Sequence, residues 1–149
     1  MTKAKIVQAI LFISLLLMFC DKNKQFSRRL DNDKWEVTTL SVDGKNQDTL
    51  PIIKFTFCQI YEETCTGSWS SLDGKARIAW QFRDGGKTFE LSNQTNHGHN
   101  LADLNAANQC IRFTGVYEVV NYKRKSLEVK SLKTFGYPGK TVIMKMEKQ

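Results

Sequence analysis

The clearest alternation of apolar and polar residues in the chain runs over residues 75–92, KARIAWQFRDGGKTFELS. Every second side chain is apolar on both sides of Asp84-Gly85-Gly86. A period of two places one set of side chains on an apolar face and the other in water, and adjacent glycines supply the positive φ angles of a tight turn. The stretch therefore predicts a β-hairpin.

Six further segments share this strand-like pattern and are separated by turn residues. They are Trp35–Val42, Pro51–Phe57, Thr66–Leu72, Ile111–Tyr122, Leu127–Thr134 and Lys140–Glu147. Short, regularly spaced antiparallel strands favour a sandwich or an up-and-down barrel, and eight strands close a barrel that either fills with side chains or holds one small ligand. We expect one all-β domain over residues 34–149, an eight-stranded antiparallel up-and-down barrel.

Residues 1–19 have the pattern of an export signal. Two lysines precede an apolar run from Ile6 to Phe19, which is short for a membrane span of about 20 residues. The run ends in Leu17-Met18-Phe19-Cys20, which resembles the signal of bacterial lipoproteins, in which a Cys becomes N-terminal and lipidated. The resemblance implies a lipid on Cys20 and a membrane-anchored protein of the bacterial cell envelope, on the periplasmic or outer-membrane side. An uncleaved anchor and ordinary secretion are the alternatives.

Residues 20–33 are polar and charged, with Phe26 and Leu30 as the apolar exceptions. This composition predicts a polar tether between the signal segment and the barrel.

The order and spacing of the strands resemble the small bacterial lipocalin-like lipoproteins, which are calycin-type β-barrels. The resemblance is carried by Trp35 at the first strand, FTF before Cys58, CTGSW, the IAWQF and KTFEL hairpin, YEVVNYKRKSLEV and the final TVIMKME. In lipocalins a basic residue near the last strand packs on that Trp, and Lys145 is the candidate here. Trp35 itself is expected to be core at one end of the barrel.

The alternation and the resemblance together predict an apolar interior that binds a small hydrophobic ligand. The expected interior residues are Phe55, Phe57, Trp80, Phe82, Phe89, Leu91, Phe113, Tyr117 and Met144. In the alternative, the same residues fill the barrel, and the protein is a non-enzymatic envelope interaction or structural protein.

The net charge of +7 arises from 22 basic and 15 acidic residues, with small basic clusters at Arg28-Arg29 and Lys123-Arg124-Lys125. Scattered charges favour a solvated surface, with attraction to an anionic membrane as the alternative. A nucleic-acid partner is not expected, because the chain carries no aromatic-interleaved basic stripe or known reader motif.

Three cysteines remain besides Cys20. Cys58 and Cys65 flank a polar loop between two predicted strands, so we expect a disulfide between them; Cys110 either stays buried and reduced or pairs with Cys65 instead. The spacing of the three matches no strong zinc motif, and no metal site is predicted.

Residues 93–109 form a long polar segment that contains both histidines, as His97-Gly98-His99. We expect a solvated loop in which residues 101–109 make one short helical turn over the barrel mouth, with a metal site as the less favoured alternative. The chain shows no catalytic triad, phosphate loop or pair of carboxylates, so neither an enzyme nor a cofactor is predicted, and we expect a monomer.

Overall fold

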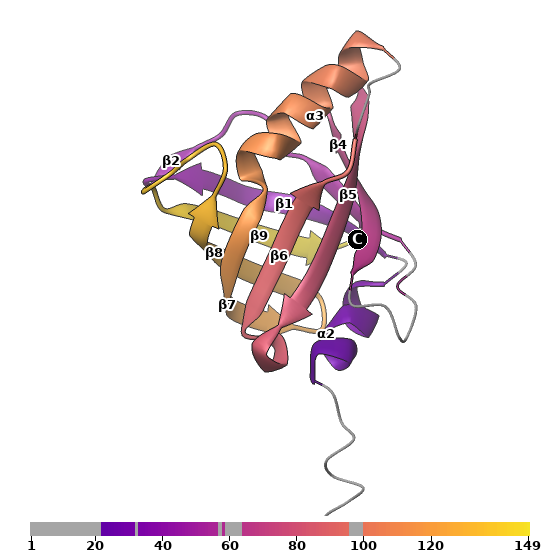
Figure 1. The fold of residues 1–149 in the computed structure, drawn as a ribbon, viewed down its shortest axis with the longest axis vertical. Helices are drawn as coiled ribbons and strands as arrows, with labels where there is room; N and C mark the ends of the chain where they lie inside the picture. Colours follow the sequence, from indigo (N-terminus) through magenta and orange to yellow (C-terminus); the bar gives the residue numbers. More distant parts are fainter. Residues whose placement is uncertain (1–21, 32, 57, 59–63, 96–99) are drawn as a thin grey trace, which may run out of the picture.

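The computed structural model describes residues 22–31, 33–56, 58, 64–95 and 100–149, and in these residues eight antiparallel strands close into a barrel (Figure 1). The strands are β1 (Asp33–Val42), β3 (Ile52–Phe55), β4 (Cys65–Ser71), β5 (Gly74–Arg83), β6 (Thr88–Asn93), β7 (Gly115–Lys123), β8 (Ser126–Thr134) and β9 (Val142–Lys148). Each pairs with the next, and the pairing of β1 with β9 closes the barrel. The short β2 (Lys45–Asn46) folds back on the end of β1. The predicted all-β barrel is confirmed.

The predicted strand from Ile111 is wrong at its beginning, because Ile111 belongs to the helix α3 (Leu101–Phe113). β7 begins only at Gly115, which has a φ of 153°. A Cβ at this position would lie 2.0 Å from the backbone oxygen of Lys133 in β8, so only glycine lets the two strands start this close together.

The interior of the barrel is packed with apolar side chains from all eight strands, as the period of two requires. Phe55 lies at the centre of this packing, with ring centroids 4.9 Å from Trp80 and 6.3 Å from both Trp35 and Phe89. Trp35 is fully buried, as predicted for a core residue. Lys145, the expected basic partner of Trp35, instead forms an ion pair with Glu128, 3.4 Å away, from a half-exposed position on β9.

The structure differs from the predicted polar tether at residues 22–30, which form the helix α2 (Lys22–Leu30). Phe26 and Leu30 lie four residues apart and therefore on one face of the helix. Leu30 is fully buried, and the ring of Phe26 packs edge-on against Phe82 at 5.5 Å and Tyr122 at 4.7 Å. These two apolar residues dock the segment onto the barrel.

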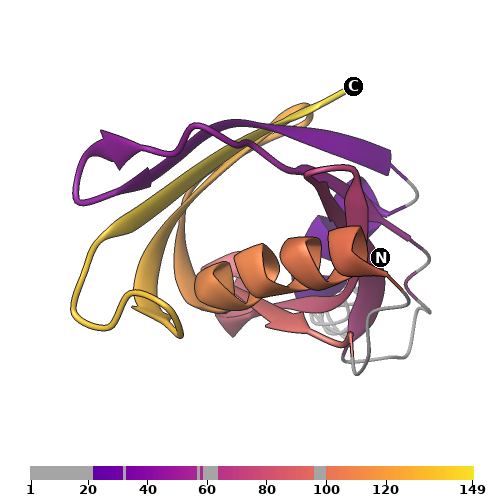
Figure 2. The same ribbon diagram turned by 90° about the horizontal axis from the view of Figure 1, so that it is seen from above.

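Two helices therefore cover the two ends of the barrel. α2 lies at the end where β1 begins and where the β5–β6 and β7–β8 turns meet, whereas α3 crosses the opposite end, as the view from above shows (Figure 2). In the described residues, neither helix has the length and apolar character needed to cross a membrane.

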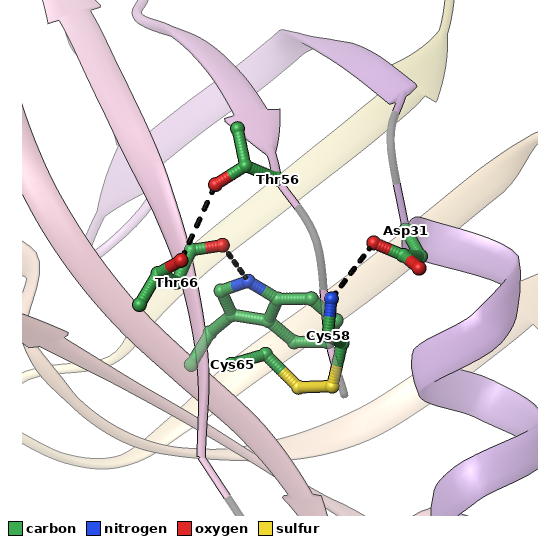
Figure 3. The surroundings of a disulfide bond; sticks show 6 residues. Asp31, Thr56, Cys58, Cys65 and Thr66 are labelled. Carbon is green, nitrogen blue, oxygen red and sulfur yellow. Dashed lines mark hydrogen bonds between the residues drawn. A yellow bond between two sulfur atoms is a disulfide. The ribbon is translucent and has the colours of Figure 1, made fainter. Parts of the chain in front are cut away.

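The predicted disulfide between Cys58 and Cys65 is confirmed and lies at the end covered by α2 (Figure 3). The Cα atoms of the two cysteines are 4.7 Å apart. The backbone N–H of Cys58 donates to Oδ1 of Asp31 at 3.0 Å, so the disulfide is also tied to the residue that follows α2. Cys110 is the buried free cysteine, in α3.

Candidate functional site

The helix α3 lies close over one end of the barrel because small residues face inward. Asn100 caps the helix by accepting a hydrogen bond from the backbone N–H of Asp103 at 2.8 Å. Ala106, Ala107 and Cys110 are buried beneath the helix. The backbone also passes tightly over the β4–β5 turn, where a Cβ on Gly74 would lie 1.9 Å from the backbone oxygen of Ala102. The predicted single turn is thus a helix of 13 residues.

Gln109 connects α3 to two other parts of the barrel rim. Nε1 of Trp69 on β4 donates to its Oε1 at 2.9 Å, and its own Nε2 donates to the backbone oxygen of Thr49 at 3.1 Å. Four residues further on, Phe113 stacks on Trp69 with a centroid distance of 5.9 Å and also lies 5.2 Å from Tyr137. Hydrogen bonds and ring contacts therefore fix the last turns of α3 at this end.

A cavity of about 420 Å³ lies beside these contacts, and we call it the mouth pocket. Four separate segments line it: the loop after β2, the β4–β5 turn, one face of α3 and the loop between β8 and β9. The lining residues are Gln47, Asp48, Thr49, Leu72, Asn105, Asn108, Gln109, Arg112, Phe113 and Tyr137. Pockets of roughly 300 to 1,000 Å³ hold small molecules in proteins, so the mouth pocket has the size of a binding site.

The lining of the mouth pocket divides into an apolar part and a polar part. The rings of Phe113 and Tyr137 supply an apolar wall, while the side chains of Asn105 and Asn108 supply amide donors and acceptors. Arg112 and Asp48 add one charge of each sign, and both side chains are exposed to solvent. Such a lining suits a small molecule with an apolar body and a polar group.

Covalent chemistry is not indicated at this end of the barrel. Burial raises the pKa of the Cys110 thiol to about 12, which keeps it protonated and unreactive at neutral pH. Among the described residues, no cluster of three His, Cys, Asp or Glu side chains could hold a metal ion. His97 and His99 lie outside the described residues.

The structure places the predicted interior residues together, with Phe57 lying outside the described part of the chain. The other eight are all buried: Phe55, Trp80, Phe82, Phe89, Leu91, Phe113, Tyr117 and Met144. The rings of Phe55, Trp80, Phe82 and Phe89 contact one another, and Phe113 is the member of the set that also lines the mouth pocket. Whether these residues contact a ligand stays a prediction.

A second cavity of about 420 Å³ lies where β7 begins, between the ends of β6 and β8. Trp80 and Leu91 of the predicted interior set line it together with the outward-facing Gln81 and Glu90, and Phe135 at its rim is 75% exposed. It therefore opens on the outer face of the barrel, away from the mouth pocket.

Sequence reasoning missed the polar part of the mouth pocket. Its α3 amides, Asn105, Asn108 and Gln109, lie in the stretch that was expected to be largely a solvated loop, and Arg112 lies at the start of the segment that was expected to be a strand. The only available signal was the mixture of Leu and Ala with Asn and Gln over residues 101–109, which supports a helix with a polar face.

Comparison with solved structures supports the assignment of the fold. The chain is similar to Japanin from Rhipicephalus appendiculatus, whose crystal structure contains bound cholesterol. The TM-score is 0.50, the sequence identity is 8%, and the match covers 80% of this chain and 76% of Japanin. No protein-family model matches the chain, and no curated protein matches it. At this level of identity the likeness establishes the fold alone, an eight-stranded lipocalin-like barrel.

Proposed function

We propose that the protein is a binding protein that holds a small amphipathic molecule in the mouth pocket. The observation that carries this proposal is the position of a pocket of about 420 Å³ between aromatic rings and the amide face of α3. The apolar body of the molecule packs on Phe113 and Tyr137. Its polar group receives hydrogen bonds from the amides of α3, with Arg112 at hand for a negative charge.

The mouth pocket is favoured over the deep interior because the interior rings already contact one another. A molecule that extended from the pocket into the barrel would have to displace Phe113 from Trp69. It would also have to break both hydrogen bonds of Gln109. We therefore propose that the two hydrogen bonds of Gln109 hold α3 in place and separate the mouth pocket from the interior.

Japanin adds support of a limited kind. The cholesterol in its crystal structure is an apolar molecule with one hydroxyl group, which is the class of ligand that the mouth pocket suits. Because the likeness itself establishes only the fold, the argument rests on the residues of this chain.

The alternative is a filled barrel that acts through its surface as an envelope interaction or structural protein. The observation in its favour is the dense packing of rings, with Phe82 and Phe89 at 5.2 Å and Phe55 and Trp80 at 4.9 Å. Under this alternative the mouth pocket would have no specific occupant.

The location that we propose is the bacterial cell envelope, with the protein anchored through its N-terminal segment. The support is the apolar run of residues 6–19 followed by Cys20. If Cys20 carries the lipid, Cys20→Ala abolishes membrane attachment in cell fractionation and incorporation of a labelled fatty acid, and the barrel stays folded. A mutant that stays in the membrane, with no label in either protein, would indicate an uncleaved anchor.

The binding proposal is tested with 1-anilinonaphthalene-8-sulfonate, an aromatic anion whose fluorescence increases in apolar sites. Asn108→Trp fills the mouth pocket from the exposed face of α3, so we expect the affinity for the probe to fall about tenfold or more, a loss of at least about 1.4 kcal/mol. Leu104→Trp is the matched control, because Leu104 lies one turn away on the same helix, is 44% exposed and does not line the pocket. It should change the affinity less than about twofold.

Native mass spectrometry of protein purified from its own membrane provides the second measurement. A co-purifying small molecule that Asn108→Trp removes and Leu104→Trp retains supports the proposal. If the wild type binds no probe and carries no molecule, binding fails as the function and the filled-barrel alternative replaces it.

A further inference from the structure

The positive charge of the chain gathers at one end of the barrel, the end that α2 covers. Three segments meet there: α2 itself, the β5–β6 turn at residues 84–87 and the β7–β8 turn at residues 123–125. We call these three segments together the basic end. Its basic residues are Lys22, Lys24, Arg28, Arg29, Lys87, Lys123, Arg124 and Lys125.

The basic end accounts for the whole positive charge of the barrel and α2. Its 16 residues contain eight basic side chains and one acidic side chain, Asp84. The other residues from 22 to 149 contain 12 basic and 13 acidic side chains and so are close to neutral. Basic residues that are scattered along the sequence therefore lie together at one end of the barrel in three dimensions, where they are exposed to solvent.

Direct contacts hold the three segments together. The hydroxyl of Tyr122, next to the β7–β8 turn, donates to the backbone oxygen of Phe26 in α2 at 2.8 Å, and the guanidinium carbon of Arg29 lies 5.8 Å from the ring of Tyr122. On the other side, the backbone N–H of Gly86 donates to Oδ1 of Asn23 at 2.8 Å. A Cβ on Gly86 would lie 1.7 Å from the ring of Phe26, so the glycine is what lets α2 dock on this turn.

The basic side chains of the basic end are exposed to solvent, and three carboxylates lie near them. All eight basic residues of the basic end are exposed. Asp31 accepts from the backbone of Cys58, Asp33 forms an ion pair with Lys148, and Asp84 accepts from the hydroxyl of Thr88 at 2.9 Å. Eight basic side chains therefore stand against three carboxylates, of which Asp33 is paired with Lys148, and the basic end is net positive.

The path of the chain indicates what this surface meets. The apolar run of residues 6–19 joins the barrel at Lys22, at the beginning of α2, so either form of membrane attachment brings the basic end next to the bilayer. Anionic headgroups attract Lys and Arg side chains that lie within about one Debye length, roughly 10 Å at moderate salt.

We propose that the basic end docks on an anionic lipid surface. The protein then stands with α2 and the two turns on the headgroups, and the mouth pocket, at the opposite end of the barrel, opens away from the membrane. The inference rests on the proposed anchoring only for the presence of a membrane, and it is independent of any ligand.

The test compares the binding of the full chain to phosphatidylcholine vesicles with and without phosphatidylglycerol. The apolar N-terminal segment contributes to both, so the ratio of the two partition coefficients reports the charge effect. We expect a ratio well above one that decreases with added salt. Arg124→Glu with Lys125→Glu reverses two exposed charges in the β7–β8 turn and should lower the ratio about tenfold or more, since each charge near such a surface contributes strongly.

The matched control is Lys45→Glu with Lys75→Glu, which makes the same change of charge at the end covered by α3. It should alter the ratio less than about twofold. If circular dichroism shows that the first pair of Glu substitutions unfolds the barrel, Arg124→Gln with Lys125→Gln removes the charge without reversing it. This pair should lower the ratio in the same direction by a smaller factor.

Two results would overturn the proposal. In the first, the wild-type ratio is close to one, or the control pair lowers it as much as the β7–β8 pair does. In the second, a short single-stranded oligonucleotide, at the same phosphate concentration, binds the protein more tightly than the vesicles and displaces it from them, which would make the basic end a nucleic-acid surface. A failure of anchoring in the Cys20→Ala experiment is distinguishable, since it leaves the ratio unchanged.

Discussion

The two ends of the barrel are each covered by a helix, but the helices dock in different ways. α2 packs one large ring, Phe26, edge-on against Phe82 and Tyr122, which stack on each other. α3 instead presents small residues to the barrel, Ala106, Ala107 and Cys110, and reserves its one ring, Phe113, for its last turn.

This difference in packing gives the two ends different surfaces. At the end covered by α2, large side chains fill the space, and the exposed surface consists of basic residues. At the end covered by α3, the side of the helix that does not face the barrel core borders a pocket lined by amides and rings. The end covered by α2 is thus filled and carries a basic surface, whereas the end covered by α3 carries a pocket. The following predictions test whether the two ends are independent.

The largest effect is expected from Trp80→Ala, which removes a buried ring in contact with Phe55, Phe82 and Phe89. The loss of transfer free energy and the cavity left behind should lower the free energy of unfolding by about 3 to 5 kcal/mol. Urea denaturation measures it. A loss below about 1 kcal/mol would mean that the interior is looser than the ring distances indicate.

Removal of the Cys58–Cys65 disulfide should have the next largest effect on stability and should act only on the end covered by α2. The cysteines are seven residues apart. In the chain-entropy model, closing such a loop stabilises the fold by about 2 to 3 kcal/mol. The double substitution Cys58→Ser and Cys65→Ser should therefore lower the melting temperature while the affinity of the mouth pocket for the probe stays unchanged. A parallel loss of probe binding would contradict the independence of the two ends.

Alkaline pH should destabilise both ends, through different groups. Burial raises the pKa of Cys110 in α3 above its usual value. Burial also raises the pKa of Tyr122, which contacts α2, above its usual value. These groups stay protonated in the folded state at a pH where the unfolded chain loses their protons. Their contribution to the free energy of unfolding is therefore complete at neutral pH. It declines as the pH rises through the pKa values of the unfolded chain, about 8.5 for Cys and 10 for Tyr.

The decline should reach about 1.4 kcal/mol per pH unit for each group once the unfolded chain is ionised. Unfolding curves between pH 7 and 11 measure it. Cys110→Ala should flatten the curve first, from about pH 9, and Tyr122→Phe should flatten it only above about pH 10. A stability that stays constant to pH 11 in the wild type would contradict the burial of both groups.

The smallest effect is expected from Gln109→Ala, which removes the hydrogen bonds that join α3 to Trp69 and Thr49. Two hydrogen bonds are lost, so the free energy of unfolding should fall by about 1 to 2 kcal/mol. Amide hydrogen exchange in α3 should become faster while exchange in α2 stays the same. Equal acceleration of exchange in both helices would show that Gln109 stabilises the whole barrel and not α3 alone.

The strands could be predicted from the sequence because the period of two is a local signal. All eight appear in the structure, and the main error at Ile111 arose where an apolar strand pattern continued from a helix without a break. The extent of α3 was not predictable from its Asn-rich sequence, because contacts with the barrel stabilise most of this helix. For α2 a signal was present: Phe26 and Leu30 have the spacing of one helical face.

The mouth pocket and the basic end could not be predicted, because both are made by segments far apart in the chain. Residues 47–49 meet α3 and Tyr137 only once the barrel has closed. In the same way, the clusters at residues 28–29 and 123–125 lie nearly a hundred residues apart and are joined by the contact of Phe26 with Tyr122. A single sequence gives the charges, whereas the topology of the barrel decides which of them share an end.

Amide hydrogen exchange of the full chain, bound to vesicles of phosphatidylcholine and phosphatidylglycerol, tests most directly whether the two ends have separate tasks. Exchange is followed segment by segment, with neutral vesicles as the reference. The account predicts slower exchange in α2 and in the turns at residues 84–87 and 123–125, with no change in α3 or in residues 136–141. Protection of α3 by the anionic vesicles, or equal protection at both ends, would contradict it.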